Sequence, residues 1–297
     1  MCGEEMKSWT KEIERQLEMF RSKPYVAYDR LVPVGKLLVA QFKVEQGLSR
    51  NELCPSLNEE TIRDRIEKGI PILDGQAVCL DEGLLRELLE DIHLLPLGDP
   101  LEEAVCRLLS ADAGGKILPA IVRRVFSGEP GIFPGLDLEL DAKTAEGFKA
   151  LALMLAAPFL RCCARAVRPA LLLESITSRE CPMCGGAPRM ARLRQSDGKR
   201  LLECSECRFQ WGFERLKCPY CFNEDQKALN YFFIEEETAY RLDTCEVCNR
   251  YIKTLDERKL AVEAPKGLFI TDMATQYLDI LAQKNNYLAI TDGNRSY

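Results

Sequence analysis

The chain has 297 residues and a mass of 33.6 kDa, which predicts two folded parts rather than one compact domain. Its composition, with 46% apolar and 29% charged residues, is ordinary for a globular protein and excludes disorder as the main state. The net charge of -6 argues against nucleic-acid binding driven by overall charge. A single histidine, His93, excludes a His-rich metal site or a relay of several histidines within the chain.

The N-terminal segment carries charges from Glu4 onward and lacks the apolar core of a secretory signal. The longest apolar stretches, such as residues 151–160, are too short to span a bilayer. We therefore expect a cytoplasmic protein with no membrane span. In that reducing compartment, clustered cysteines are more often metal ligands than disulfides.

The first part of the chain, residues 1–176, has the apolar spacing of helices. The stretch 9–20 repeats apolar residues at three- and four-residue intervals, which places them on one helix face. Asp99 and Pro100 resemble a helix start. Other stretches with helical spacing lie at residues 34–44, 84–95, 101–109, 116–126 and 142–163. The pattern predicts an all-α domain of roughly six to eight helices.

Beyond the helical part, short segments rich in β-branched and aromatic residues replace the long helical patterns. Two hairpins are predicted, at residues 189–204 and 229–245. A Ser-Asp-Gly turn at 196–198 separates the arms of the first hairpin, and three glutamates at 235–237 form the polar tip of the second. Helical spacing returns at residues 272–284, which we expect to form a C-terminal helix docked on one of the two parts.

Eight of the fourteen cysteines form four Cys-x-x-Cys knuckles, whose tight turns can aim two sulfurs at one ion. The gaps between successive knuckles are 19, 10 and 23 residues. The two long gaps suit a hairpin that returns to the same ion, and the short gap suits a linker between two sites. The predicted metal ligands are Cys181, Cys184, Cys204 and Cys207 in the first site, and Cys218, Cys221, Cys245 and Cys248 in the second.

Other uses of these cysteines stay open. An interleaved order, in which knuckle one pairs with three and two with four, requires longer crossings. Polynuclear iron–sulfur clusters are a less simple fit than two mononuclear sites. Catalytic dithiol chemistry is disfavoured, because a redox pair normally sits at a helix start after a strand. Four thiolates accept zinc or iron with similar tetrahedral geometry, so the spacing does not decide the metal.

The residue that follows each knuckle affects how easily the backbone adopts the tight turn of that knuckle. Gly185 follows the first knuckle, where glycine permits the turn and a close approach of backbone N–H groups, as in a rubredoxin knuckle. Arg208, Phe222 and Asn249 follow the other three, and of these only Asn249 shares some of that backbone tolerance.

Six further cysteines and the single histidine lie outside the knuckles, and the sequence predicts the surroundings of two of these residues. Cys106 lies on an apolar helix face and is expected in the core. His93, between Ile92 and Leu94, is expected to be buried and hydrogen-bonded rather than a ligand.

Charge is distributed unevenly over the two cysteine-rich halves. Residues 181–217 hold eight basic and four acidic residues, whereas residues 218–253 hold four basic and seven acidic ones. Such a dipolar surface suits oriented docking of a protein partner. The only feature that favours nucleic-acid binding is a basic run consisting of Arg189, Arg192, Arg194, Lys199 and Arg200.

Four stretches of the cysteine-rich part carry a resemblance to a known family. They are CPMCGGAPRM at 181–190, LLECSECRFQWGFERLKCPYC at 201–221, LDTCEVCNRYIKT at 242–254 and FITDMATQYLDILAQKNNY at 269–287. These stretches resemble the formate dehydrogenase accessory protein FdhE family. Residues of the same type as in the family's pattern include Trp211, Arg215, Asp243, Tyr251 and Lys253. The chain departs from the pattern at Asn285-Asn286-Tyr287, where the family usually has a glycine before the aromatic residue.

The resemblance implies a non-catalytic, cytoplasmic assembly factor with an all-α domain and two rubredoxin-like sites. The implied partner is the molybdenum- or tungsten-containing catalytic subunit of respiratory formate dehydrogenase, bound before its export. The implied cofactors are two mononuclear metal ions per chain, with iron favoured and zinc as the alternative. A homodimer is kept as an alternative assembly.

Together, these features predict an α+β multidomain protein. Its expected parts are an all-α helical domain at 1–176, a first rubredoxin-like or zinc-ribbon module at 177–217, a second at 218–265, and a C-terminal helix and tail at 266–297. We expect Arg215 and Lys253, which lie beside the knuckles, to contact the client. The alternative functions are a zinc-ribbon nucleic-acid-binding protein and a rubredoxin-like electron carrier.

Overall fold

The computed structural model describes residues 2–48, 58–73, 78–111, 117–127, 141–167 and 178–289. The chain divides into two compact units. The first unit consists of Met1–Glu14, Val32–Lys68 and Ile72–Pro169, and the second of Arg15–Leu31, Gly69–Pro71 and Ala170–Tyr297. The predicted boundary at residue 176 lies outside the described residues. Residues 15–31, predicted to be part of the helical domain, are grouped with the cysteine-rich part instead.

Within the described residues every predicted helical stretch contains helix, with one helix added and with the C-terminal stretch divided into two helices. The helices are α1 (Cys2–Arg21), α2 (Tyr28–Gly47), α4 (Glu59–Glu67), α5 (Glu82–His93), α6 (Leu101–Ala111), α7 (Ile117–Ser127), α8 (Ala142–Val167), α9 (Phe269–Ala274) and α10 (Gln276–Lys284). The addition is α4, which the apolar spacing misses because its one buried residue is Ile62. A side-chain cap compensates for this weak apolar face, since Asn58 Oδ1 accepts a hydrogen bond from Thr61 N at 2.8 Å.

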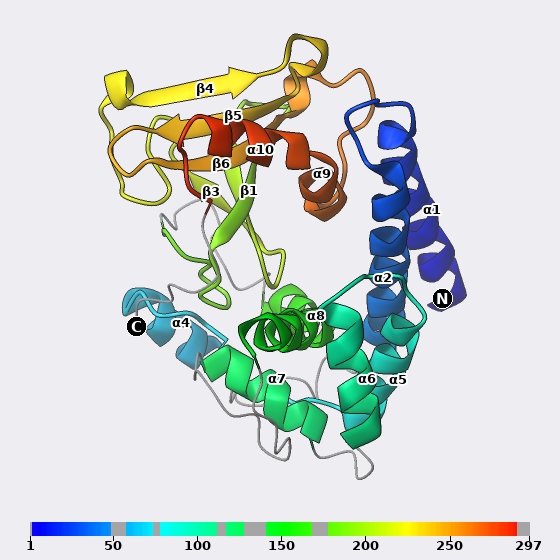
Figure 1. Ribbon diagram of the computed structural model, residues 1–297. Coiled ribbons are helices and arrows are strands. Elements are labelled where there is room, and N and C mark those ends of the chain that lie inside the picture. Colours follow the sequence, from blue (N-terminus) through cyan, green and yellow to red (C-terminus); the bar gives the residue numbers. More distant parts are fainter. Residues whose placement is uncertain are drawn as a thin grey trace. The chain divides into compact units, whose positions relative to one another are not determined.

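Helix α8 forms the core of the first unit, where it lies against α6 and α7 (Figure 1). Phe148, Leu155 and Phe159 on this helix are fully buried. Gly147 lets the helix approach the segment before α6, because a Cβ at Gly147 would lie 2.5 Å from the carbonyl oxygen of Pro100. The absence of a side chain at this position therefore sets the distance between α8 and the start of α6.

Among the described residues, α8 is also the one helix long and apolar enough to cross a membrane by composition. However, 67% of its most apolar window is buried inside the protein. An apolar helix buried in this way is expected at the centre of a helical domain. The apolar character of α8 is thus explained by its place in the core of the first unit.

Two sequence expectations in this unit are wrong. Cys106 is exposed rather than part of the core, because the buried face of α6 runs through Ala104, Val105 and Leu108. His93 is exposed as well, since it is the last residue of α5 and lies off the buried face of that helix.

The second unit contains a six-stranded sheet with the strand order β3-β2-β1-β6-β5-β4. Its strands are β1 (Pro188–Leu193), β2 (Arg200–Cys204), β3 (Gln210–Phe213), β4 (Leu229–Phe233), β5 (Tyr240–Cys245) and β6 (Arg250–Asp256). Both predicted hairpins are present, as β1–β2 and β4–β5. Strands β1 to β3 form one antiparallel ribbon, and strands β4 to β6 form a second one. Strands β1 and β6 pair in parallel and so join the two ribbons into one sheet.

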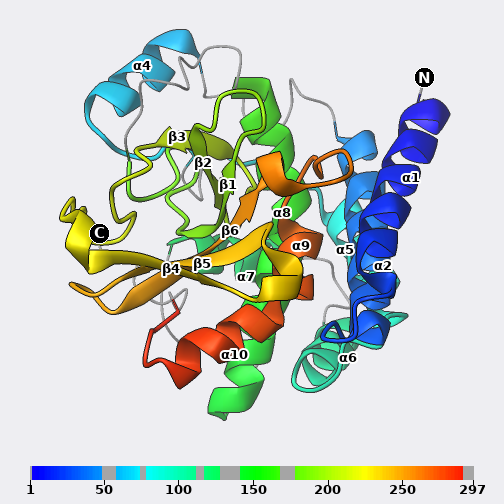
Figure 2. The same ribbon diagram turned by 90° about the horizontal axis from the view of Figure 1, so that it is seen from above.

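Helices α9 and α10 pack beside β5 and β6 in the second unit (Figure 2). The single helix predicted at 272–284 is divided at Thr275, whose Oγ1 donates to the carbonyl oxygen of Thr271 at 2.8 Å. The C-terminal part of α1 belongs to this unit, where the ring of Phe20 lies 5.7 Å from that of Tyr240. This aromatic contact explains why residues 15–31 are grouped with the sheet.

Candidate metal centres

The eight knuckle cysteines gather into two groups of four in the second unit. Within each group all sulfur atoms lie within 4.8 Å of one another. The groups follow the sequential order predicted from the spacing, and the interleaved order is not found. The first group consists of Cys181, Cys184, Cys204 and Cys207, and the second of Cys218, Cys221, Cys245 and Cys248.

The sulfur separations fit a single tetrahedral ion in each group. Cys181 and Cys207 Sγ lie 3.5 Å apart, as do Cys184 and Cys204 Sγ. In the second group both the Cys218–Cys248 and the Cys221–Cys245 separations are 3.7 Å. A tetrahedral zinc with sulfur ligands at about 2.3 Å places those ligands about 3.8 Å apart. Each group is therefore arranged to hold one zinc- or iron-sized ion with four thiolates, and the geometry does not distinguish the two metals.

All four knuckles have the same turn. The residue after the second cysteine has a positive φ in every case: 75° at Gly185, 56° at Arg208, 60° at Phe222 and 53° at Asn249. The turn aims backbone N–H groups at sulfur, as when Glu206 N donates to Cys204 Sγ and Tyr220 N donates to Cys218 Sγ, both at 3.4 Å. The knuckle geometry therefore outweighs the preference of arginine and phenylalanine for negative φ.

Gly186 lies directly against the first metal group. A Cβ at this position would lie 2.8 Å from Cys204 Sγ, which is closer than a carbon and a sulfur approach without a bond. Gly186 also closes the knuckle, since its carbonyl oxygen accepts from Cys181 N at 2.8 Å. The glycine pair after the first knuckle thus has two separate roles, one in the turn and one in leaving room for the sulfur.

When no cation is bound, hydrogen bonds among the thiols of the first group couple their ionisation. Burial, reinforced by neighbouring thiols, raises the pKa of Cys181 well above its usual value. Burial opposes ionisation of Cys204 too, but hydrogen bonds from the neighbouring thiols lower its pKa well below the usual range. One thiolate is thus stabilised by the protons of the others. All four can ionise only if a cation replaces those protons, so metal binding is expected to release protons.

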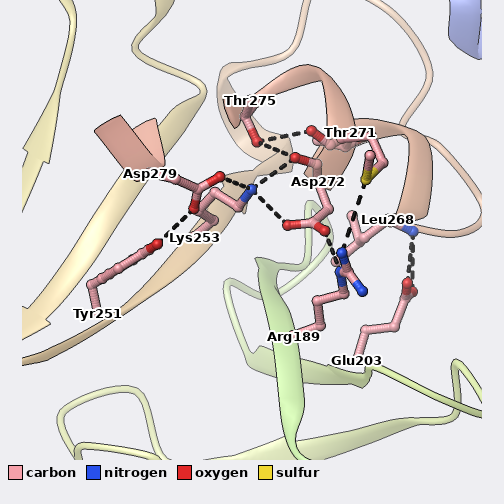
Figure 3. A network of polar contacts seen from close by, with 10 residues as sticks. Arg189, Glu203, Tyr251, Lys253, Leu268, Thr271, Asp272, Thr275 and Asp279 are labelled. Carbon is pink, nitrogen blue, oxygen red and sulfur yellow. Dashed lines mark hydrogen bonds and ion pairs between the residues drawn. The ribbon is translucent and has the colours of Figure 1, made fainter. Parts of the chain in front are cut away.

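A buried polar network ties α9 and α10 to the sheet (Figure 3). Lys253 Nζ of β6 lies 2.7 Å from Asp272 Oδ1 of α9 and 2.8 Å from Asp279 Oδ2 of α10. Arg189 of β1 pairs with the same Asp272 carboxylate. Although burial opposes ionisation of Asp272, these two cations lower the pKa of its carboxyl. Tyr251 completes the network by donating from its hydroxyl to Asp279 Oδ1 at 2.8 Å.

Of the two residues predicted to contact a client, the structure exposes one. Arg215 lies in the exposed turn between β3 and the third knuckle. Lys253 is 5% exposed, and its ammonium group is occupied by the Asp272 and Asp279 carboxylates. The side chain of Lys253 therefore holds the C-terminal helices on the sheet and is not available to a partner at the surface. Its place beside a knuckle in the sequence does not reveal that the strand turns it inward.

The basic run predicted as a nucleic-acid feature does not form one open face. Arg189 pairs with Asp272, Arg192 with Glu257, and Arg194 with Asp197. Arg200 is buried. Because these guanidinium groups are paired with carboxylates or buried, they do not present the continuous positive surface that phosphate backbones bind.

The comparisons with known proteins point to one family. A family model described as the FdhE central domain matches residues 180–215, which span the whole first metal group. An FdhE homologue of Aquifex aeolicus is 34% identical over 113 residues, covering 37% of this chain and 39% of the relative. An FdhE homologue of Pseudomonas aeruginosa is 30% identical over 126 residues, covering 39% of each. In these matches the chain spans about two fifths of the length of the curated relatives.

The fold of the whole chain is also similar to a solved structure. The crystal structure of the FdhE protein from Pseudomonas aeruginosa superposes with a TM-score of 0.64 at 23% sequence identity. The superposition covers 96% of this chain and 94% of that one, so the likeness extends over the helical part as well. At this identity the superposition shows the shared fold. Taken with the family model and the sequence relatives, it shows that the chain is similar to FdhE proteins in fold and, over its cysteine-rich part, in sequence.

Proposed function

We propose that this protein is a non-catalytic assembly factor that binds the catalytic subunit of a formate dehydrogenase in the cytoplasm before its export. The client follows from the family resemblance noted in the sequence. The observation that supports a non-catalytic role is the pair of complete four-cysteine groups. Four protein ligands fill every position of a tetrahedral ion, so no open position is left for a substrate.

In this proposal the eight cysteines hold two mononuclear ions, iron by family resemblance or zinc as the alternative. The ions supply the free energy that folds the knuckles, which have few apolar residues of their own. Among the residues predicted to contact the client, Arg215 is in a position to do so, because it is exposed beside the third knuckle.

The proposal is tested by co-expressing the chain with a formate dehydrogenase catalytic subunit and purifying the metal-loaded protein. We expect the subunit to co-purify in a defined ratio, and no formate oxidation by the chain alone. Elemental analysis of the same sample identifies the metal. If a metal-replete chain retained no catalytic subunit, the proposed client would be wrong.

A rubredoxin-like electron carrier is the second candidate. The N–H···S hydrogen bonds to Cys204 and Cys218 favour it, since such bonds tune the potential of iron–thiolate sites. An anaerobic optical titration decides the question. A reversible Fe(III)/Fe(II) transition without client binding supports the carrier, and a zinc-loaded protein that binds the client supports the assembly factor.

A further inference from the structure

Four arginines from distant parts of the sequence meet at one cavity in the second unit. The cavity has a volume of about 160 Å³ and lies beside the second metal group. Arg200 at the start of β2, Arg215 in the turn after β3, Arg241 of β5 and Arg250 at the start of β6 all line it. Among the described residues, the one carboxylate in the lining is Asp243.

The cavity contains a buried guanidinium group whose hydrogen-bonding capacity is only partly used. Arg200 is 4% exposed, and its Nη1 donates to the carbonyl oxygen of Lys217 at 3.2 Å. Its Nε and Nη2 atoms are buried and have no hydrogen-bond partner in the described part of the chain, and Nη2 lies 3.5 Å from Asp243 Oδ2. Burial accordingly lowers the pKa of Arg200, and the nearby Asp243 opposes this effect. Such a group is normally paired, which indicates a missing acceptor.

The single carboxylate of Asp243 cannot form ion pairs with all the arginines around it. Its Oδ1 lies 2.8 Å from Arg241 Nε, and its Oδ2 accepts from the Thr254 hydroxyl at 2.8 Å. Within the described residues, Arg215 and Arg250 make no side-chain ion pair. The thiolates of the second metal group offset part of the positive charge, but none of these guanidinium groups donates to their sulfurs in the described structure. The cavity therefore offers several guanidinium donors to an anion.

The rim of the cavity is apolar and aromatic. Tyr231 is 57% exposed and Leu216 is 58% exposed, and both line the cavity. Phe233 stacks on Tyr231 at 6.1 Å and is also exposed. Tyr231 and Phe233 lie on β4, the edge strand of the sheet, whose outer side pairs with no other strand in the described chain. An extended peptide with an acidic residue between apolar ones complements this combination better than a free inorganic anion does.

We propose that this cavity binds a carboxylate side chain of the client polypeptide, presented by an extended segment whose apolar neighbours contact Tyr231 and Phe233. The inference deepens the proposed function and rests on it for the identity of the client. The guanidinium groups of Arg200, Arg241 and Arg250 recognise the carboxylate, because a planar fork of N–H donors matches two carboxylate oxygens.

The direct test uses the metal-loaded full chain and a fluorescent peptide of alternating glutamate and leucine, followed by fluorescence anisotropy. We expect binding that weakens roughly ten- to hundredfold when glutamine replaces glutamate in the peptide, or in the variants Arg241→Gln and Arg250→Gln. Lys284→Gln, which removes one positive charge from the exposed end of α10, is the matched control and should bind as the wild type does. Inorganic phosphate should compete only weakly.

Several results would overturn the proposal. Equal binding of the glutamate and glutamine peptides would show that no carboxylate is recognised. Loss of metal in Arg250→Gln would mean that the arginines serve the thiolates instead. Full displacement by inorganic phosphate, with no peptide preference, would make the cavity a phosphate site. The outcome is separable from that of the proposed function: if the catalytic subunit co-purifies equally with wild type and Arg241→Gln, the assembly role stands and the cavity assignment fails.

Discussion

Arg208 and Phe222 adopt a backbone conformation that neither residue prefers, at φ values of 56° and 60°. A left-handed conformation costs a non-glycine residue about 1–2 kcal/mol. Contacts elsewhere offset this cost. The Arg208 guanidinium lies 4.2 Å from the Phe269 ring centroid, and the Phe222 ring stacks on Phe213 at 6.0 Å. At these positions the side chain packs against the unit, whereas at Gly185 a Cβ would lie 2.9 Å from Pro71 Cγ, so there the missing side chain also leaves room for Pro71.

The tight fit of Gly186 yields a prediction for the first metal group. Gly186→Ala should lower metal occupancy to about one ion per chain, because the new methyl group would displace Cys204 Sγ. The second group should keep its ion. Metal content after gel filtration measures the effect. Gly267→Ala is the matched control, since a Cβ at Gly267 has no neighbour within 4 Å. Two ions bound to Gly186→Ala would show that the sulfur can move aside.

Within the polar network, substitution of the Asp272 carboxylate is expected to lower stability the most. Asp272→Asn removes the buried anion that Lys253 and Arg189 share, while Lys253 keeps Asp279 and Arg189 is partly exposed, so the loss should cost about 1–3 kcal/mol. Hydrogen exchange should report the loss as faster exchange of the α9 amides. Asp197→Asn is the control, because its pair with Arg194 is exposed and should have no measurable effect on α9. Unchanged exchange in Asp272→Asn would refute the anchoring role.

At the scale of elements, the position of α8 depends on one glycine. Alanine normally stabilises a helix relative to glycine, by roughly 0.5–1 kcal/mol. Gly147→Ala should nevertheless lower the stability of the first unit by about 1–3 kcal/mol, because the methyl group meets the backbone of Pro100, which cannot rotate away. Thermal unfolding followed by circular dichroism tests this expectation. Gly83→Ala, near the N-terminus of α5, serves as control, and equal stability of both variants would contradict the steric explanation.

The two hairpins place their knuckles on separate ions, which a cysteine substitution can test. Cys204→Ser should remove the first ion and leave the second, because Cys204 shares a group with Cys184 and not with any cysteine after residue 217. Limited proteolysis should then cut within β1 to β3. Cys106→Ser, an exposed position on α6, should retain both ions. Exposure of β4 to β6 in place of the first ribbon would contradict the sequential grouping.

At the scale of the whole molecule, metal binding and pH are coupled. Burial raises the pKa of Cys218 to about 11, and Cys181 is shifted in the same direction, so protons compete strongly with a cation for these thiols. Metal affinity should therefore fall as the pH is lowered from about 7.5 to about 5. Metal content after dialysis at each pH measures the effect, and pH-independent occupancy would contradict it.

The same titration should leave the C-terminal helices in place. The pKa of Asp272 is lowered in the folded protein, so its ion pairs stabilise the fold above the unfolded-state pKa and are lost only as the pH falls through the folded one. Between about pH 7.5 and about pH 5 the carboxylate stays ionised, since an ordinary aspartate titrates near 3.9. Amides of α9 and α10 should keep their protection over this range if the ion pairs anchor them.

The sequence alone determined the features that depend on local spacing. Apolar periodicity located the helices of the first unit except α4, and turn residues such as Asp197-Gly198 located the hairpins. The four knuckles and their unequal gaps predicted two sequential four-cysteine groups, which the structure confirms. These features are readable because each involves residues close together in the chain, where helix and turn geometry link spacing directly to position.

Only the tertiary structure decided the features that join distant segments. The parallel pairing of β1 with β6 merges the two ribbons into one sheet, and residues 15–31 join the same unit. The sheet turns Lys253 inward against Asp272, although its neighbours in the sequence suggested an exposed contact. It also brings Arg200 to the cavity that it shares with Arg241. No local pattern encodes these contacts, because each depends on the burial and charge of partners many residues away.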